Sequence, residues 1–208
     1  MFQLEDFVRY FLAIYFLMIG LYYGSRSYAM SEREGISFIG YGARFSAGWW
    51  HRHCFNLFRA GILVVCVSRL FVDIDPYLGS LDFLATEVVL IAGVVALLMG
   101  YSVVSYVAGY MHKDWFSGVA PPAHAQQLIT QGPFARSRNP LFIGILLGQI
   151  GFFLALPSLF SLLCLLVGGW VIRRQAILEE TALLLRYGNA YQAYREATPR
   201  WGSLKKAG

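Results

Sequence analysis

Charged residues are scarce in this sequence, and apolar residues take their place. Asp, Glu, Lys and Arg make up 14% of the 208 residues, whereas hydrophobic residues make up 57%. A typical soluble domain carries about 25% charged and about 45–50% apolar residues. The composition therefore excludes an ordinary soluble domain and predicts an integral membrane protein.

Cysteine and the common catalytic motifs are also missing or rare. Cys54, Cys66 and Cys164 stand far apart, so neither a disulfide framework nor a thiolate metal site is indicated. The sequence has no GxGxxG, GxxxxGK[ST], GxSxG or HExxH motif, which excludes the usual nucleotide and hydrolase sites of soluble proteins. The four histidines lie outside the interiors of the expected membrane helices, and we predict no metal site.

Five apolar segments approach the length of about 20 residues that a membrane-spanning helix needs. The fourth is short, and only Pro157-Ser158 separates it from the fifth, which predicts a tight helical hairpin. The sequence thus predicts an all-α, polytopic membrane helix bundle in a single domain, residues 1–208, with a cytoplasmic C-terminal helix. The expected transmembrane segments are 7–24, 54–72, 83–108, 141–156 and 159–178.

Basic residues are concentrated in alternate connections of this bundle. Segments 25–53 and 110–140 and the C-terminal tail are rich in Arg and Lys, whereas segment 73–82 has three Asp and neither Lys nor Arg. Because short cytoplasmic loops retain Lys and Arg, the pattern predicts an outside N-terminus and a cytoplasmic C-terminus. The net charge of +5 then fits contact with anionic lipid headgroups, and we predict no nucleic-acid partner. The sequence carries no signal of oligomeric state.

The first candidate site lies where a basic loop meets the fourth apolar segment, within residues 132–144. Arg138 precedes Asn139, a favoured N-cap residue, and Pro140, which suits the first helical position. Free N–H groups at a helix N-terminus attract anions. The pattern predicts an anion site at the lipid–water boundary, and the alternative is a capped helix with basic residues held on the cytoplasmic side.

The second candidate site lies where the fifth segment leaves the membrane. Arg173, Glu180 and Tyr187 are spaced by seven residues and would share one helical face. Ionisable groups that emerge from a membrane helix are costly unless they are paired or functional. The spacing therefore predicts a site, and the alternative is an interfacial salt bridge.

Taken together, the two sites resemble the isoprenylcysteine carboxyl methyltransferase and phospholipid methyltransferase superfamily of integral membrane enzymes. The resemblance covers residues 126–201 and rests on a Gly-Pro-Phe lead-in, an Arg-x-Pro-x-x-x-Gly run and a Glu-Glu pair followed by spaced tyrosines and Pro-Arg. Two residues depart from the pattern, because Gln126 and Asn139 stand where the family commonly has histidine. An amide still forms hydrogen bonds but does not titrate near neutral pH.

The resemblance implies that S-adenosylmethionine is the cofactor, bound on the cytoplasmic side without a Rossmann fold. It implies catalytic roles for Arg173 and Glu180, in which Arg173 orients a carboxylate acceptor or Glu180 takes a proton from an amine. The donor's carboxylate suits Arg138 and the helix N-terminus, its cationic groups suit the Glu-Glu pair, and its adenine suits aromatic rings. The implied cofactor-binding residues are Gln126, Leu128, Gly132, Phe134, Arg138, Asn139, Pro140, Phe142, Gly144, Glu179, Glu180, Tyr187 and Tyr191.

The expected function is therefore methyl transfer from S-adenosylmethionine to a lipophilic acceptor, such as an isoprenylcysteine carboxylate or a lipid headgroup. The main alternative is an NADPH-dependent membrane reductase similar to sterol reductases, whose motif has an acidic residue after the glycine. Here Gly144 is followed by Ile145. A third hypothesis is a membrane protein with the same helical fold that binds a ligand without catalysing a reaction.

Overall fold

The computed structural model describes residues 3–34, 44–111 and 127–202 of the chain. Within these residues the structure is helical, which confirms the predicted all-α class. The long helices are α1 (Leu4–Glu34), α2 (Ala47–Ser68), α3 (Glu87–Met111), α4 (Pro140–Ala155), α5 (Leu159–Tyr187) and α6 (Asn189–Ala197). Short 3-10 turns are η1 (Asp75–Leu78), η2 (Asp82–Leu84) and η4 (Gly132–Ala135).

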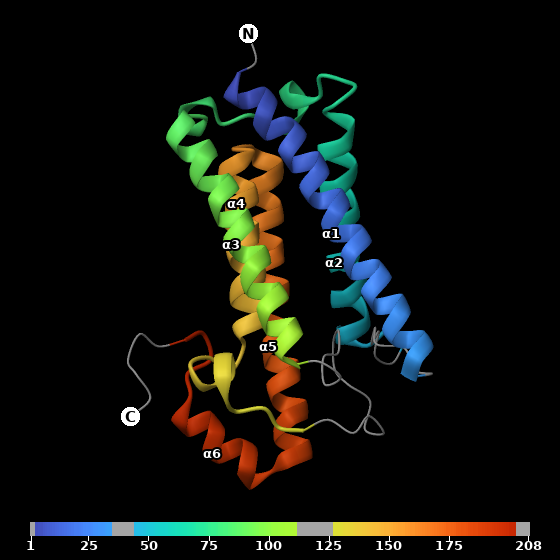
Figure 1. Cartoon of the computed structure of the whole chain (residues 1–208), viewed down its shortest axis with the longest axis vertical. Helices are drawn as coiled ribbons and strands as arrows, with labels where there is room; N and C mark the ends of the chain where they lie inside the picture. The colour runs from blue at the N-terminus through green and yellow to red at the C-terminus, as the bar shows by residue number, and fades with distance from the viewer. Residues whose placement is uncertain (1–2, 35–43, 112–126, 203–208) are drawn as a thin grey trace.

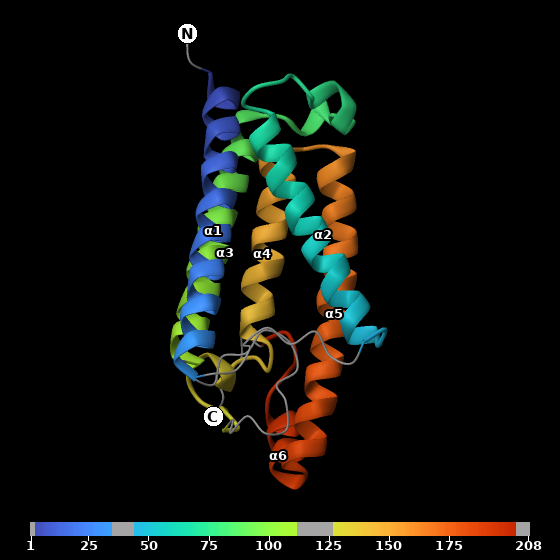
Figure 2. The ribbon, with the colours of Figure 1, turned by 90° about the vertical axis from the view of Figure 1, so that its right-hand side faces the viewer.

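Helices α1 to α5 run along one long axis and alternate in direction (Figures 1 and 2). The connection 69–86 and the turn between α4 and α5 lie at one end of the bundle. The beginnings of α2 and α4 and the end of α5 lie at the other end, where α6 folds back (Figure 2). The connections predicted to be basic, 25–53 and 110–140, thus start and finish at the α6 end of the bundle, and the acidic connection 73–82 lies at the opposite end. This arrangement agrees with the predicted alternation of basic and acidic connections.

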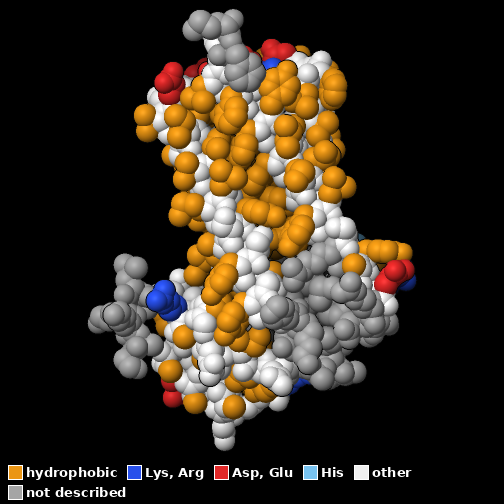
Figure 3. Space-filling view, in the orientation of Figure 1, with side chains coloured by type: hydrophobic (Ala, Val, Ile, Leu, Met, Phe, Trp, Pro, Cys, Tyr) orange, Lys and Arg blue, Asp and Glu red, His pale blue; other side chains and the backbone are white. Residues whose placement is uncertain are grey.

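Among the described residues, three helical segments are long and apolar enough to cross a membrane: Leu4–Ser25, Glu87–Met111 and Leu159–Tyr187. Helix α4 is a shorter apolar helix, as the short fourth segment predicted. Hydrophobic side chains cover much of the upper surface in Figure 3, over these helices. The predicted helical membrane bundle is therefore confirmed, with fewer clear spans than the five expected.

The second expected span, 54–72, differs most from the structure. Helix α2 begins earlier, at Ala47, because the Ser46 side chain accepts a hydrogen bond from the N–H of Trp49 at 3.2 Å. It ends at Ser68, where the chain turns toward η1. Helix α2 contains the polar Asn56 and Arg59, and it is not among the candidate spans of the described residues.

Helices α3 and α4 pack with their backbones almost in contact. A Cβ atom added to Gly100 of α3 would lie 2.6 Å from the backbone nitrogen of Gly148 in α4. A Cβ atom added to Gly151 of α4 would lie 2.6 Å from the backbone nitrogen of Leu97. Small residues allow membrane helices to come this close to each other. The packing against α3 therefore sets the position of α4 and of its first residues.

At the end of the bundle opposite α6, an ion cluster ties α1 and α2 to η1. Arg9 donates to Asp75 Oδ2 at 2.8 Å, and Arg69 donates to both Asp75 carboxylate oxygens. Burial of Asp75 alone would raise its pKa, but the hydrogen bonds and charge of Arg69, with those of Arg9, hold the pKa below its usual range. No pattern in the sequence predicted this cluster.

Candidate functional site

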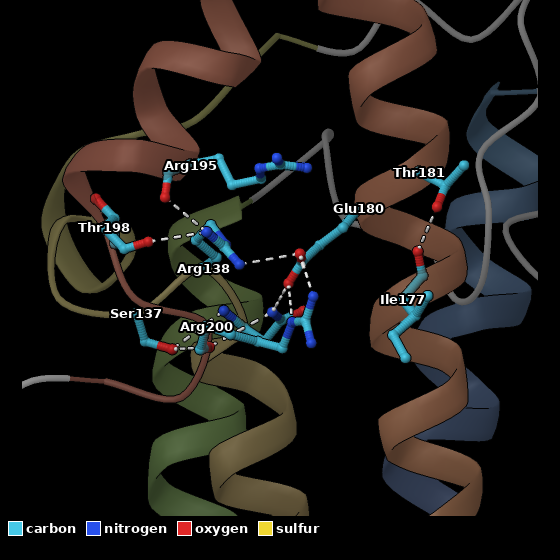
Figure 4. Close-up of polar contacts among 9 residues, drawn as sticks. Ser137, Arg138, Ile177, Glu180, Thr181, Arg195, Thr198 and Arg200 are labelled. Atoms are coloured by element: carbon cyan, nitrogen blue, oxygen red, sulfur yellow. Dashed lines mark hydrogen bonds and ion pairs between the residues drawn. The ribbon is translucent and has the colours of Figure 1, made fainter.

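The Glu180 carboxylate lies at the centre of a buried polar cluster at the α6 end of the bundle. Glu180 is 7% exposed. Its Oε1 accepts hydrogen bonds from Arg200 Nε at 2.8 Å and Asn139 Nδ2 at 2.9 Å. Its Oε2 accepts from Arg138 Nη2 and Arg200 Nη2, both at 3.0 Å (Figure 4). Since a carboxylate offers about four acceptor sites, its hydrogen-bonding capacity is filled.

Three segments distant in sequence form this cluster: α5, the loop before α4 and the segment after α6. The backbone N–H of Arg138 donates to the carbonyl of Pro199 at 3.0 Å. The Arg138 guanidinium also donates to the carbonyls of Arg195, at 2.7 Å, and Thr198, at 3.1 Å (Figure 4). The Ser137 hydroxyl donates to the carbonyl of Arg200 at 2.9 Å. The segment after α6 is thus fastened to the loop that starts α4.

Asn139 occupies the N-cap position of α4, as the sequence predicted, but its side chain makes no capping hydrogen bond. The side-chain amide instead donates to Glu180, and the backbone N–H donates to the Ser137 hydroxyl at 3.1 Å. A cap would use the amide oxygen as an acceptor, whereas this contact uses the amide nitrogen as a donor to an ionised carboxylate, which is a strong acceptor. The cap position therefore links α4 to α5.

Two hydrogen-bond donors beside this cluster are buried without a partner in the described part of the chain. They are Arg138 Nε and the hydroxyl of Tyr191, a residue that is 1% exposed. Burial, and next the charge of Glu180, raise the pKa of Tyr191 to about 12, so its hydroxyl keeps its proton near neutral pH. Arg138 and Arg200 together carry one more positive charge than Glu180 balances. These features suit an anionic or hydrogen-bond-accepting group.

The remaining residues predicted near α4 have mixed surroundings. Gly132 has a φ of +61°, and an added Cβ would lie 2.6 Å from the Tyr110 ring, so both conformation and space favour glycine. An added Cβ at Gly144 would lie 2.8 Å from Val104, which places Gly144 at the α3 contact. Pro140 is buried, and Leu128, Phe134 and Phe142 are partly buried. Gln126 lies outside the described residues.

The predicted residues of α5 fall into separate places. Glu179 accepts a hydrogen bond from Gln175 at 2.9 Å, whereas its neighbour Glu180 enters the cluster. Tyr187 lies beneath the Arg186 guanidinium, at 5.8 Å from its ring centre. Arg173 is exposed and lines a surface groove of about 330 Å³ with Trp170, Arg174 and Ile177. The structure thus brings together Arg138, Asn139 and Glu180, and leaves Arg173 on the surface.

Arg200 is the residue that sequence reasoning missed. It formed part of the Pro-Arg pair at the end of the resemblance but received no role, and the structure gives it two of the four hydrogen bonds to Glu180. Tyr194 was also missed; its hydroxyl donates to the carbonyl of Phe134 at 2.7 Å and so attaches α6 to η4. Both residues lie in the part of the chain that the resemblance covers, but no spacing in the sequence places Arg200 against Glu180 or Tyr194 against Phe134.

Residues 88–190, about half of the chain, match the family model described as phospholipid methyltransferase. The chain belongs to this family. No curated protein and no solved structure matches the chain.

Membership of the phospholipid methyltransferase family confirms the resemblance to the integral membrane methyltransferases. It makes the chain a membrane methyltransferase with lipid-type substrates. The matched region contains Arg138, Asn139 and Glu180, and it ends just before Tyr191. It also weighs against the reductase and the non-catalytic binding protein that the sequence had left open.

Proposed function

We propose that the chain transfers a methyl group from S-adenosylmethionine to a lipophilic acceptor at the cytoplasmic face of the membrane. One observation carries the proposal: the matched region contains a buried, charged cluster at the N-terminus of the apolar helix α4. Arg138, Asn139 and Glu180 form it, and Arg138 and Tyr191 contribute buried donors without partners in the described residues. Residues 126–201 would then form the cofactor-binding and catalytic region.

The residues present fit such a cofactor. Arg138 and the N–H groups at the start of α4 would hold its carboxylate, which agrees with the surplus positive charge of the cluster. The partly buried Phe134, Phe142 and Tyr187 offer rings against which adenine would stack, whereas the ring of Tyr191 is enclosed. S-adenosylmethionine supplies an electrophilic methyl group bound to a sulfonium.

The acidic pair, Glu179 and Glu180, has a role other than direct binding of the donor's cationic groups alone. Glu180 already accepts hydrogen bonds from three residues, so its first task is to fix Arg138 and Asn139 in place. A cationic amino group would have to share Glu180 with these donors or use the neighbouring Glu179. Positioning of this kind, together with exclusion of water, is what methyl transfer mainly requires of a protein.

The acceptor would reach the site from the bilayer. Arg173 precedes Glu180 by seven residues, which is about 10 Å along α5 at roughly 1.5 Å per residue. The groove that Arg173 lines includes Trp170 and Ile177, so it offers a positive charge beside apolar surface. An acidic or phosphate-bearing lipid head would be oriented by Arg173 while its tail stays in the membrane.

The test is methyl transfer in proteoliposomes. Lipid extracts are incubated with the protein and isotopically labelled S-adenosylmethionine, and methylated products are found by their mass shift. The lipophilic acceptor and its water-soluble headgroup analogue are then compared. Each methylene removed from the tail should cost about 0.8 kcal/mol of binding. Equal catalytic efficiency for the two acceptors would contradict access from the bilayer.

A further inference from the structure

We propose that Arg200 is a positioning residue of the methyl-donor site. It does not itself contact the donor; its ion pair holds the Glu180 carboxylate in the orientation that places Asn139 and Arg138 at the start of α4. This inference rests on the proposed function, because the affinity that Arg200 controls is affinity for the methyl donor.

The hydrogen bonds to Glu180 show how Arg200 would act. Arg200 donates one hydrogen bond to each carboxylate oxygen, at 2.8 and 3.0 Å, in the forked geometry that fixes a carboxylate plane. Without Arg200, each oxygen would keep a single partner, Asn139 on one side and Arg138 on the other. The carboxylate would then lose half of its hydrogen bonds and its forked contact, so its orientation relative to Asn139 and Arg138 would be less well defined.

The side chain of Arg200 can be separated from its backbone role. Its side chain is 35% exposed, whereas the side chains of Arg138 and Glu180 are 9% and 8% exposed. The local backbone is held independently, because the carbonyls of Pro199 and Arg200 accept hydrogen bonds from Arg138 and Ser137. Truncating Arg200 therefore removes the ion pair while the chain segment stays attached.

The experiment compares the full-length protein with four variants in detergent or proteoliposomes. Arg200→Ala removes the ion pair, and Arg200→Gln keeps most of the side chain and an amide donor. Arg200→Lys keeps the charge but cannot form the fork. Arg195→Ala is the matched control, since it removes a positive charge from α6 while its carbonyl still accepts from Arg138. Calorimetry gives the affinity for S-adenosylhomocysteine, and kinetics separate kcat from the donor KM.

We expect Arg200→Ala to weaken donor affinity by about tenfold or more, and Arg200→Lys to recover only part of it. The acceptor KM should stay within about twofold of wild type, and Arg195→Ala should match wild type. Adding methylguanidinium ion should restore donor affinity to Arg200→Ala and leave Arg195→Ala unchanged. A general loosening of the fold would not respond to that ion.

Unchanged donor affinity in Arg200→Ala would overturn the inference while leaving the proposed function intact. Failure of the wild-type protein to bind S-adenosylhomocysteine would instead sink the proposed function itself. If Arg200→Ala and Arg200→Gln both fail to fold while Arg195→Ala folds, Arg200 serves the fold and not the site, and the inference is wrong.

Discussion

Asn139 donates its side-chain amide to Glu180 across 2.9 Å, although it stands at the N-cap of α4. This contact joins the loop before α4 to α5, two segments separated by 41 positions in the sequence. An amide keeps the same charge at every physiological pH, whereas a histidine at this position would titrate near neutrality. The link between α4 and α5 is therefore insensitive to pH in this range.

Replacing this amide with a carboxylate should destabilise the protein. Asn139→Asp removes a donor and places a second negative charge against Glu180, and a buried group left without its partner costs about 1–3 kcal/mol. For a chain of this size, each kcal/mol lowers Tm by roughly 2–4 °C. Thermal unfolding in detergent measures it, with the exposed Asn189→Asp in α6 as control. Equal Tm values for the two variants would refute the buried contact.

The contact between α3 and α4 predicts opposite effects for two glycines of the same helix. A Cβ at Gly100 would lie 2.6 Å from a backbone atom of Gly148, so Gly100→Ala should cost about 1–3 kcal/mol through overpacking. A Cβ at Gly109 would meet nothing within 4 Å. Gly109→Ala should therefore be neutral or stabilise α3 by about 0.5–1 kcal/mol. Thermal unfolding that ranks the two variants in the reverse order would be incompatible with this packing.

The Asp75 cluster predicts a stability change in acid. The folded-state pKa of Asp75 is lowered, so its contribution is complete above the unfolded pKa of about 3.9 and is lost as pH falls through the folded pKa. Asp75→Asn should lower Tm at pH 7. The difference in Tm between this variant and the wild type should become smaller below about pH 4. Asp73→Asn, at an exposed position of the same connection, is the control. A gap independent of pH would contradict the ion pairing.

The predicted orientation can be tested by labelling introduced cysteines in a Cys54→Ser background, since Cys66 and Cys164 are buried. Asp82→Cys lies at the acidic end of the bundle and should react with an impermeant maleimide on intact cells. Asn189→Cys, at the start of α6, should react only after the membrane is permeabilised. Labelling of position 189 alone on intact cells would reverse the assigned orientation.

Local patterns in the sequence were sufficient to predict α1, α3, α4 and α5, the hairpin at Pro157-Ser158 and the cap position of Asn139, whereas α2 begins and ends earlier than the expected span. They predicted Arg138 and Glu180 as site residues but not their pairing. Arg200 escaped prediction because its contact with Glu180 depends on how the chain reverses through α6, which no local spacing reveals. Gly144 shows the opposite difficulty, since the resemblance implied a role in cofactor binding, whereas the structure packs this glycine against Val104 of α3.

The binding of S-adenosylhomocysteine to the purified protein tests the central claim most directly. Calorimetry should show binding to wild type and to Glu196→Gln, an exposed control in α6. Glu180→Gln and Arg138→Ala should each bind about tenfold more weakly or worse, because a charged hydrogen bond is worth roughly 1.5–3 kcal/mol. Wild-type protein that fails to bind, or affinity unchanged in both site variants, would contradict a methyl-donor site built around Glu180.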